Sequence, residues 1–277
     1  MQLKAPAKIN LSFEIKARRP DGFHEIETLM APLSLADQIH LETDRTFQGV
    51  QFSCDDSSLP DDENNLVVRA ARNFQRKTGS RVGLKITLQK NIPHGAGLGG
   101  GSSDAATTLL GLNKLLGAEL AQSELVKLAA EIGSDVPFFL FGSAAICEGR
   151  GEFVKPSPLT RHFTILLLKP DFGVPTPWAY KGWSSSRELP GVDYATQEFS
   201  GIRFMNDLER PVFEKFIFLA HFKQWLRVQP EVGAALLSGS GSTLFAVIRD
   251  GADAEELAER VRAEVDPHLW THICATV

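Results

Sequence analysis

Apolar and polar residues alternate along positions 4–16, which is the first clear pattern in the chain. Odd positions from 5 to 15 are all apolar, whereas Lys8 and Asn10 are among the polar residues at even positions. This period of two predicts a β-strand with one face in the core, and it places Lys8 and Asn10 together on the opposite face. They are there either as functional groups or as ordinary polar residues of a solvated strand face.

Helix and strand patterns then follow one another in an order that predicts an α+β fold. Apolar residues at helical spacing predict helices at residues 64–77, 105–116, 123–132, 206–219 and 253–264. Short apolar or alternating runs predict strands at residues 23–33, 38–42, 50–53, 82–89, 144–147, 163–168, 243–249 and 271–276. Residues 181–204 are predicted to be a variable loop. At ~150 residues per domain the length indicates two domains, which we expect at residues 1–160 and 161–277.

Five glycines fall within seven residues, 95–101, between a predicted strand and a predicted helix. Glycines let backbone N–H groups approach an anion, and a helix N-terminus adds a partial positive charge. Ser102, Ser103 and Asp104 follow and are residue types that cap helices or occupy their first turn. The cluster therefore predicts a phosphate site in preference to a flexible, catalytically silent loop.

The glycine cluster matches neither of the two commonest phosphate-binding loops. No Gly-Lys-Ser/Thr is present, as a P-loop would require. Gly95, Gly97 and Gly100 have the spacing of a dinucleotide fingerprint, but that fold needs a strand after the helix, and here a second helix is predicted. A dinucleotide-dependent oxidoreductase is thus the alternative from another class, and it requires a strand after residue 116.

Two further features remain open on the residues alone. The second glycine-serine turn, at residues 237–243, is either a tight turn before a core strand or a second wall of the same phosphate site. Asp135 precedes Val-Pro, where an aspartate is commonly a helix cap, and on the residues alone the cap is favoured over a catalytic role.

Composition and charge exclude several classes of protein. The net charge is −5 with no basic half, so neither a nucleic-acid footprint nor a patch for anionic membranes is visible. Three widely separated cysteines exclude a disulfide framework and indicate a reducing cytoplasm. The longest apolar stretch, at residues 136–147, is shorter than the ~18 residues of a membrane span.

The ordered motifs resemble those of the GHMP kinases. Residues 6–11 (Pro-Ala-Lys-Ile-Asn-Leu), 19–25, 93–106 and 237–245 carry the resemblance, and residues 133–137, 149–152, 175–177 and 206–209 extend it. Residues 181–204 and 210–233 match little. The resemblance implies a two-domain α+β GHMP-kinase fold, with a ribosomal-protein-like N-terminal domain, a smaller ferredoxin-like C-terminal domain and the active site in the cleft between them.

The resemblance also implies an activity, ATP-dependent phosphorylation of a small molecule. The first two motifs are similar to those of members whose substrate is 4-diphosphocytidyl-2-C-methyl-D-erythritol, an intermediate of the methylerythritol phosphate route to isoprenoids. Asp135 would be the base that takes the proton of the substrate hydroxyl, and Lys8 would position that hydroxyl and support the transferring phosphoryl group. Another GHMP small-molecule kinase is the alternative within the family.

The binding residues are likewise implied by the resemblance. Asn10 and Thr176 would hold the methylerythritol part, His24 would read the cytosine edge, and Phe23 and Tyr180 would stack on its faces. Phe23 stands where the family commonly has tyrosine, and Tyr180 where we expect phenylalanine. The ATP site would comprise Pro93, Gly95, Gly97, Leu98, Gly99, Gly100, Gly101, Ser102, Ser103, Gly239 and Ser240.

The expected partners are small molecules. ATP usually binds with Mg²⁺, but the sequence offers no dedicated metal site beyond two carboxylates considered as ligands, Asp104 and Glu148. We expect a monomer or a weak homodimer without a nucleic-acid or membrane partner. A non-catalytic module of the same architecture would need a basic face, which the even charge distribution does not provide.

Overall fold

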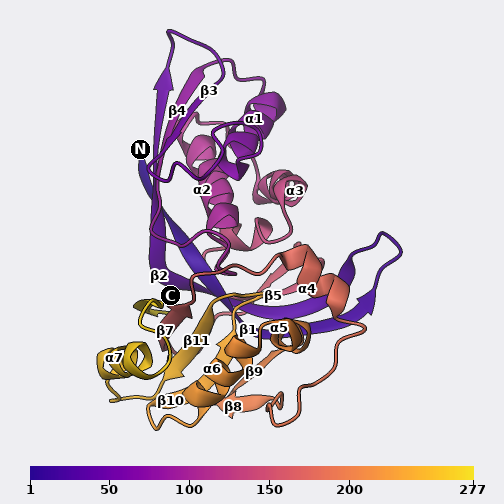
Figure 1. Cartoon of the computed structure of the whole chain (residues 1–277). Coiled ribbons are helices and arrows are strands. Elements are labelled where there is room, and N and C mark those ends of the chain that lie inside the picture. Colours follow the sequence, from indigo (N-terminus) through magenta and orange to yellow (C-terminus); the bar gives the residue numbers. More distant parts are fainter.

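The computed structural model describes all 277 residues, which form two β-sheets and the helices that cover them (Figure 1). The strands of the larger sheet are β1 (Gln2–Arg18), β2 (His24–Asp44), β3 (Val50–Cys54), β4 (Gly83–Gln89), β5 (Ala145–Gly149), β6 (Phe153–Pro156), β8 (Gln197–Phe199) and β9 (Ile202–Asn206). Those of the smaller sheet are β7 (Thr164–Lys169), β10 (Val232–Leu237), β11 (Leu244–Ile248) and β12 (Trp270–Ala275).

The helices divide between the same two parts of the chain. Those before β7 are α1 (Leu66–Thr78), α2 (Gly100–Leu115), α3 (Gln122–Ile132) and the short 3₁₀ helix η1 (Pro137–Leu140). Those after β7 are α4 (Thr176–Gly182), α5 (Glu209–Lys215), α6 (Ile217–Arg227) and α7 (Ala254–Glu264). No helix combines the length and the apolar character that crossing a bilayer would require.

The order of the strands follows the chain only in part. In the larger sheet the order is β3-β4-β2-β1-β9-β8, with β5 paired to β2 and β6 to β5. The smaller sheet has the order β10-β11-β7-β12 and is antiparallel throughout. β8 and β9 come from the second half of the chain, yet β9 pairs in parallel with β1. The later segment therefore extends the sheet that the first segment begins.

Three hydrophobic cores hold these layers together. The first lies between α1–α3 and the larger sheet, and the second joins α5–α7 to the smaller sheet. The third lies between the two sheets, where Ile9 and Leu11 of β1 pack in one cluster with Leu167 and Phe245 of the smaller sheet. Because β1 contributes to all three clusters, it fixes the position of one half of the protein relative to the other.

The alternation along residues 4–16 correctly predicts the strand. The interpretation of Lys8 and Asn10 as ordinary polar residues of a solvated strand face is wrong. Lys8 is only 4% exposed and Asn10 only 1%. The middle of β1 is buried on both faces, because the glycine cluster and the turn after β10 cover the side that carries these two residues. Register shifts between Pro6 and Lys8 and between Asn10 and Ser12 bend the strand within this region.

Most predicted elements are confirmed, and the exceptions have physical causes. The runs at 23–33 and 38–42 form one strand, β2, because pairing with β1 resumes at Ala36 after a register shift opposite the segment between them. The helix at 206–219 is two helices, α5 and α6, separated at Phe216, and Asn206 ends β9 instead. Part of the predicted loop 181–204 is regular, since it holds the end of α4, β8 and the first residues of β9. β6, β10 and α4 were not predicted.

The start of α2 also differs from the expectation. The helix begins at Gly100, not at residue 105, and its N-cap is Gly99, which makes no side-chain capping bond. Ser102, Ser103 and Asp104 therefore lie inside the helix. Glycine is a poor helix former, so sequence preference pointed to a later start.

Gly111 allows α2 to lie close against the larger sheet. A Cβ atom added there would stand 2.4 Å from Cδ1 of Leu3 and 2.4 Å from Cδ1 of Leu41. We expect Gly111→Ala to lower the free energy of unfolding by about 1–3 kcal/mol through overpacking, although alanine is favoured over glycine in helices by ~1 kcal/mol. Urea denaturation measures this change.

Gly101→Ala is the matched control, because the new methyl group in the same helix would meet only Leu66 Cδ1, at 3.6 Å. It should leave stability unchanged or increase it. A Gly111→Ala protein as stable as the wild type would show that α2 does not depend on this close approach.

Candidate active site

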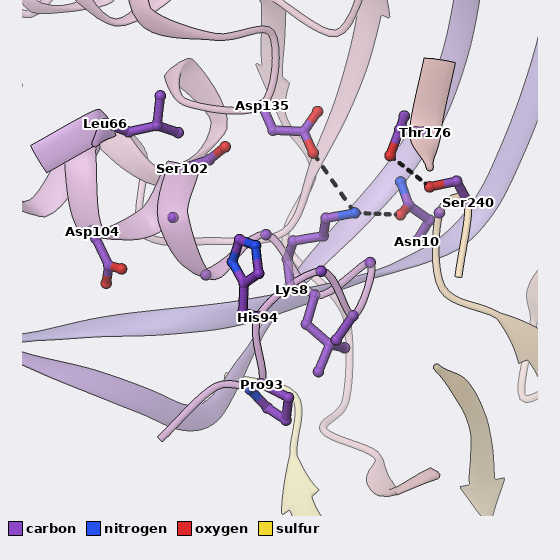
Figure 2. A pocket seen from close by; sticks show the side chains of 18 of the residues that line it. Lys8, Asn10, Leu66, Pro93, His94, Ser102, Asp104, Asp135, Thr176 and Ser240 are labelled. Atoms are coloured by element: carbon purple, nitrogen blue, oxygen red, sulfur yellow. Dashed lines mark hydrogen bonds and ion pairs between the residues drawn. The ribbon is translucent and has the colours of Figure 1, made fainter. Parts of the chain in front are cut away.

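Lys8 is the buried centre of a group of polar side chains from several elements (Figure 2). Its Nζ donates a hydrogen bond to Asn10 Oδ1 at 2.7 Å and lies 3.7 Å from Asp135 Oδ2. Asn10 Nδ2 in turn donates to Thr28 Oγ1 of β2 at 2.8 Å. β1 and β2 thus fix the lysine, and the segment before η1 brings the carboxylate to it.

The environment of Lys8 disfavours its charge. Burial lowers the pKa of the Lys8 ammonium, and the Asp135 carboxylate opposes this effect without cancelling it. The Asp135 side chain is 39% exposed and caps no helix, since η1 has Val136 as its N-cap and no side-chain capping bond. The helix-cap interpretation of Asp135 is therefore wrong, and its carboxylate remains open to a ligand.

The glycine cluster wraps the N-terminus of α2 as a tight, backbone-lined loop. Gly95, Gly97 and Gly99 have positive φ angles of 64°, 77° and 71°, which glycine adopts at low cost. The backbone N–H groups of residues 100–102 donate to no acceptor within the protein. Such free N–H groups at the positive end of a helix form an anion site.

Buried charged residues anchor this loop at its base. Asp37 Oδ1 accepts hydrogen bonds from the N–H groups of Asn91 and Ile92 at 2.6 and 2.8 Å. Lys90 forms ion pairs with both Asp37 and Asp104, the latter at 2.8 Å. These contacts join β2, the start of the loop and the first turns of α2.

The second glycine turn lies directly on the first. Ser238 Oγ donates to Gly97 O at 3.0 Å, and a Cβ atom added at Gly97 would stand 2.2 Å from Ser238 O. A Cβ atom added at Gly239 would stand 3.4 Å from Lys8 Nζ. The turn at 237–243 is therefore a second wall of the same site, in addition to leading into β11.

A cavity of about 360 Å³ extends from Lys8 along the glycine loop. Its lining includes the following predicted residues: Lys8, Asn10, Pro93, Gly95, Gly97, Leu98, Gly99, Gly100, Gly101, Ser102, Asp135, Thr176, Tyr180, Gly239 and Ser240. The far end is formed by Leu59, Pro60, Asn65 and Leu66, which were not predicted. Asn65 is recognisable in the sequence only as the N-cap of α1, whose side chain accepts from Val67 N–H.

A second cavity, of about 770 Å³, is lined by two further predicted residues, Phe23 and His24. The His24 ring stacks on that of Tyr180 with centroids 5.4 Å apart, and the Arg150 guanidinium lies over the Phe23 ring at 5.0 Å. Three cations that were not predicted to bind a ligand, Arg18, Arg150 and Lys181, also line it, against one acidic residue, Asp135. This end of the site suits a ligand with a flat ring and negative charge.

The two cavities share four lining residues, Ser102, Asp135, Thr176 and Tyr180. Ligands in the two cavities would therefore meet beside the Asp135 carboxylate and within reach of Lys8. Burial raises the pKa of the Tyr180 hydroxyl, so this group stays neutral at the junction.

Ser103 is the one predicted site residue that lines neither cavity. It is fully buried, and its N–H donates to Gly99 O within the first turn of α2. The early start of α2 turns Ser103 toward the core, whereas Ser102 faces the cavity.

The two carboxylates considered for Mg²⁺ do not come together either. Asp104 is held in its buried ion pair with Lys90, and burial raises the pKa of its carboxyl group to about 7. Glu148 is exposed on β5 and lines neither cavity. No group of three or more His, Cys, Asp or Glu side chains that could hold a metal ion is present in the chain, so Asp104 and Glu148 do not fit a shared metal site.

Comparisons with known proteins agree with this architecture. The family model described as GHMP kinases N terminal domain matches residues 65–143, and that described as GHMP kinases C terminal matches residues 201–266. The 4-diphosphocytidyl-2-C-methyl-D-erythritol kinase of Methylacidiphilum infernorum is 41% identical over 275 residues, which cover 97% of this chain and 94% of that protein.

Solved structures give the same result. A crystal structure of 4-(cytidine 5'-diphospho)-2C-methyl-D-erythritol kinase matches with a TM-score of 0.80 at 36% identity and covers 100% of both chains. The homoserine kinase from Cytophaga hutchinsonii matches with a TM-score of 0.66 at 18% identity, over 100% of this chain and 94% of that one. At this lower identity the likeness shows the fold alone.

These findings confirm the predicted two-domain α+β fold. They also decide between a GHMP kinase and a dinucleotide-dependent oxidoreductase, in favour of the kinase. α3 follows α2 without an intervening strand, so the strand that a dinucleotide-binding unit needs after residue 116 is absent. The resemblance suggested by the ordered motifs holds over nearly the whole chain. The chain belongs to the 4-diphosphocytidyl-2-C-methyl-D-erythritol kinase family of the GHMP kinases.

Proposed function

We propose that this protein transfers the γ-phosphoryl group of ATP to the 2-hydroxyl of 4-diphosphocytidyl-2-C-methyl-D-erythritol, giving the 2-phosphate and ADP in the methylerythritol phosphate route to isoprenoids. The observation that carries the proposal is the meeting of two chemically different cavities beside Asp135 and Lys8. A kinase must bring two substrates into line at one phosphorus atom, and phosphoryl transfer depends mainly on positioning and charge stabilisation.

The smaller cavity suits ATP. Its phosphates would lie against the free N–H groups of residues 100–102, with the turn at Gly239 and Ser240 on the other side. The base would point toward Leu59, Pro60 and Leu66, where the lining is apolar. Gly97 and Gly99 keep the loop tight against its neighbours, since a Cβ atom there would stand 2.2 Å from Ser238 O and 2.9 Å from Lys8 Cγ.

The larger cavity suits a cytidine diphosphate. Phe23 and Tyr180 supply aromatic faces for the cytosine, and His24 lies beside Tyr180 with a hydrogen-bonding edge. Burial and the nearby Arg18 lower the pKa of His24, which favours a neutral imidazole. Arg18, Arg150 and Lys181 would face the diphosphate. Asn10 and Thr176, nearer the junction, would hold the methylerythritol part.

The chemical step uses the junction of the cavities. The 2-hydroxyl oxygen forms a bond to the γ-phosphorus, the bond from that phosphorus to the bridging oxygen of ADP breaks, and the hydroxyl proton passes to the Asp135 carboxylate. The Lys8 ammonium holds the hydroxyl and offsets the negative charge on the transferring group. Lys8 is fixed for this role by its bond to Asn10.

Mg²⁺ would reach the site bound to ATP, since ATP, the substrate of GHMP kinases, usually carries Mg²⁺. When bound, the ion neutralises phosphate charge. Since no cluster of His, Cys, Asp or Glu side chains is placed to hold it, the roles described above belong to side chains and backbone groups of this chain.

Three wider features are part of the proposal. The division at residues 1–160 and 161–277 is supported by the two family matches, which fall on either side of it. The three cysteines are free, in keeping with a cytoplasmic location. Every residue assigned a role above comes from one chain, which is consistent with a monomer or a weak homodimer.

A substrate panel tests the assignment. With ATP and 4-diphosphocytidyl-2-C-methyl-D-erythritol we expect steady ADP release, and with homoserine or mevalonate none above background, because neither carries the ring and diphosphate that fit the larger cavity. 2-C-methyl-D-erythritol 4-phosphate is the sharper control, since it keeps the reacting group and lacks the cytidylyl part. Preferred turnover of homoserine or mevalonate would contradict the proposed substrate.

The role of Asp135 is tested by Asp135→Asn. The amide is nearly isosteric but cannot take the proton, so we expect kcat to fall by about 10²–10⁴-fold with little change in KM for ATP. Asp171→Asn is the control, because Asp171 is exposed and lines neither cavity. If Asp135→Asn retains near-normal kcat, Asp135 is not the base.

A further inference from the structure

Asn206, at the end of β9, supports the second glycine turn from behind. Its Nδ2 donates two hydrogen bonds, to Leu237 O at 2.8 Å and to Gly239 O at 2.7 Å. Its Oδ1 accepts from Leu208 N–H at 2.9 Å. Both donors and the acceptor of this buried side chain are therefore used, which fixes its orientation.

The neighbouring residues hold Asn206 in place. Asp207 Oδ2 accepts from Ile15 N–H at 2.8 Å, and Asp207 N–H donates to Phe13 O at 2.9 Å, so the segment is tied to β1. Glu209 Oε1 accepts from Leu237 N–H at 3.0 Å, while Oε2 is paired with the buried Lys223. The turn is thus braced against the strand that carries Lys8.

The hydrogen bond from Asn206 to the Gly239 carbonyl also determines the direction of the Ser240 N–H group. The C=O and N–H groups of a planar trans peptide point in opposite directions. Asn206 draws the Gly239 carbonyl away from the site, so the N–H of the same peptide, that of Ser240, points toward the cavity that Ser240 lines. This N–H has no acceptor within the protein.

The position of Ser240 identifies what such a donor would meet. Its Oγ lies 2.8 Å from Thr176 Oγ1 at the junction of the cavities (Figure 2). A Cβ atom added at the preceding Gly239 would stand 3.3 Å from Asn10 Oδ1 and 3.4 Å from Lys8 Nζ. This is the reacting end of the site, remote from the apolar end near Leu66. A backbone N–H aimed there can stabilise charge that develops during phosphoryl transfer.

We infer that Asn206 is a positioning residue that aims the Ser240 N–H at the transferring phosphoryl group. The inference rests on the proposed function. It predicts that weakening the support behind the turn lowers kcat and leaves substrate binding largely intact, because an interaction made mainly in the transition state affects kcat and kcat/KM alike.

Asn206→Asp tests the inference with little change of shape. The carboxylate can still accept from Leu208 N–H, but it faces the carbonyls of Leu237 and Gly239 without a donor. We expect kcat to fall roughly 10- to 100-fold, as a shift of about 1 Å in a positioned group costs up to 10²-fold. KM for ATP and for the cytidylyl substrate should stay within about twofold.

Gln197→Glu is the matched control. Gln197 is also a buried amide, and it bonds both to Ala235 O and to Ala235 N–H of β10, but it does not touch the turn. Both variants replace a buried amide by a carboxylate, so both should have a lower melting temperature than the wild-type protein. Only Asn206→Asp should also have a lower kcat. Equal kcat losses, or a loss confined to KM for ATP, would overturn the inference.

A measurement on the wild-type protein covers the case in which Asn206→Asp fails to fold. Amide hydrogen exchange of Ser240, followed by NMR, should be fast in the free protein and slowed at least tenfold with a non-hydrolysable ATP analogue and the cytidylyl substrate bound. Unchanged exchange would overturn the inference. Absence of wild-type turnover in the same assays would instead contradict the proposed function, so the two failures are distinguishable.

Discussion

The positive charge of Lys8 is held almost out of contact with water, and the arrangement of the active site follows from that constraint. A buried ammonium is costly unless hydrogen bonds and an opposite charge accompany it. Asn10 supplies the hydrogen bond, Thr28 fixes Asn10, and Asp135 supplies the charge at a longer distance. Since this support only partly offsets burial, the site keeps a cation that gains from an incoming phosphate.

The fold maintains this condition through β1. This strand takes part in all three hydrophobic cores, so Lys8 cannot move without disturbing both halves of the protein. The two glycine turns close over it from α2 and from β10, and they touch each other at Gly97 and Ser238. Residues far apart in the chain thereby enclose one small volume, in which phosphate, hydroxyl and carboxylate can be brought together.

The sequence predicted those parts of the site that are encoded by a short continuous stretch of residues. Alternation identified β1 and the shared face of Lys8 and Asn10, and the glycine cluster identified the phosphate loop. Burial of that face was not predictable, because it depends on the turn near Gly239, over two hundred residues away. The start of α2 at Gly100, which places Ser103 inside the helix, was likewise not predictable from the low helix preference of glycine. The apolar end near Leu59 and Leu66 carries no motif at all.

The dependence of kcat/KM on pH tests the buried charge most directly, because it reports groups of the free enzyme. Burial lowers the pKa of Lys8, so activity that needs the ammonium should be lost as pH rises through a value below the ordinary lysine pKa of about 10.4. Cys147, which with Asp135 acts on the charge of Lys8, has a pKa raised by burial to about 12 and does not titrate in that range. In Lys8→Arg any residual activity should lack this alkaline limb. A wild-type profile that stays flat up to the pKa of an ordinary lysine would contradict the account.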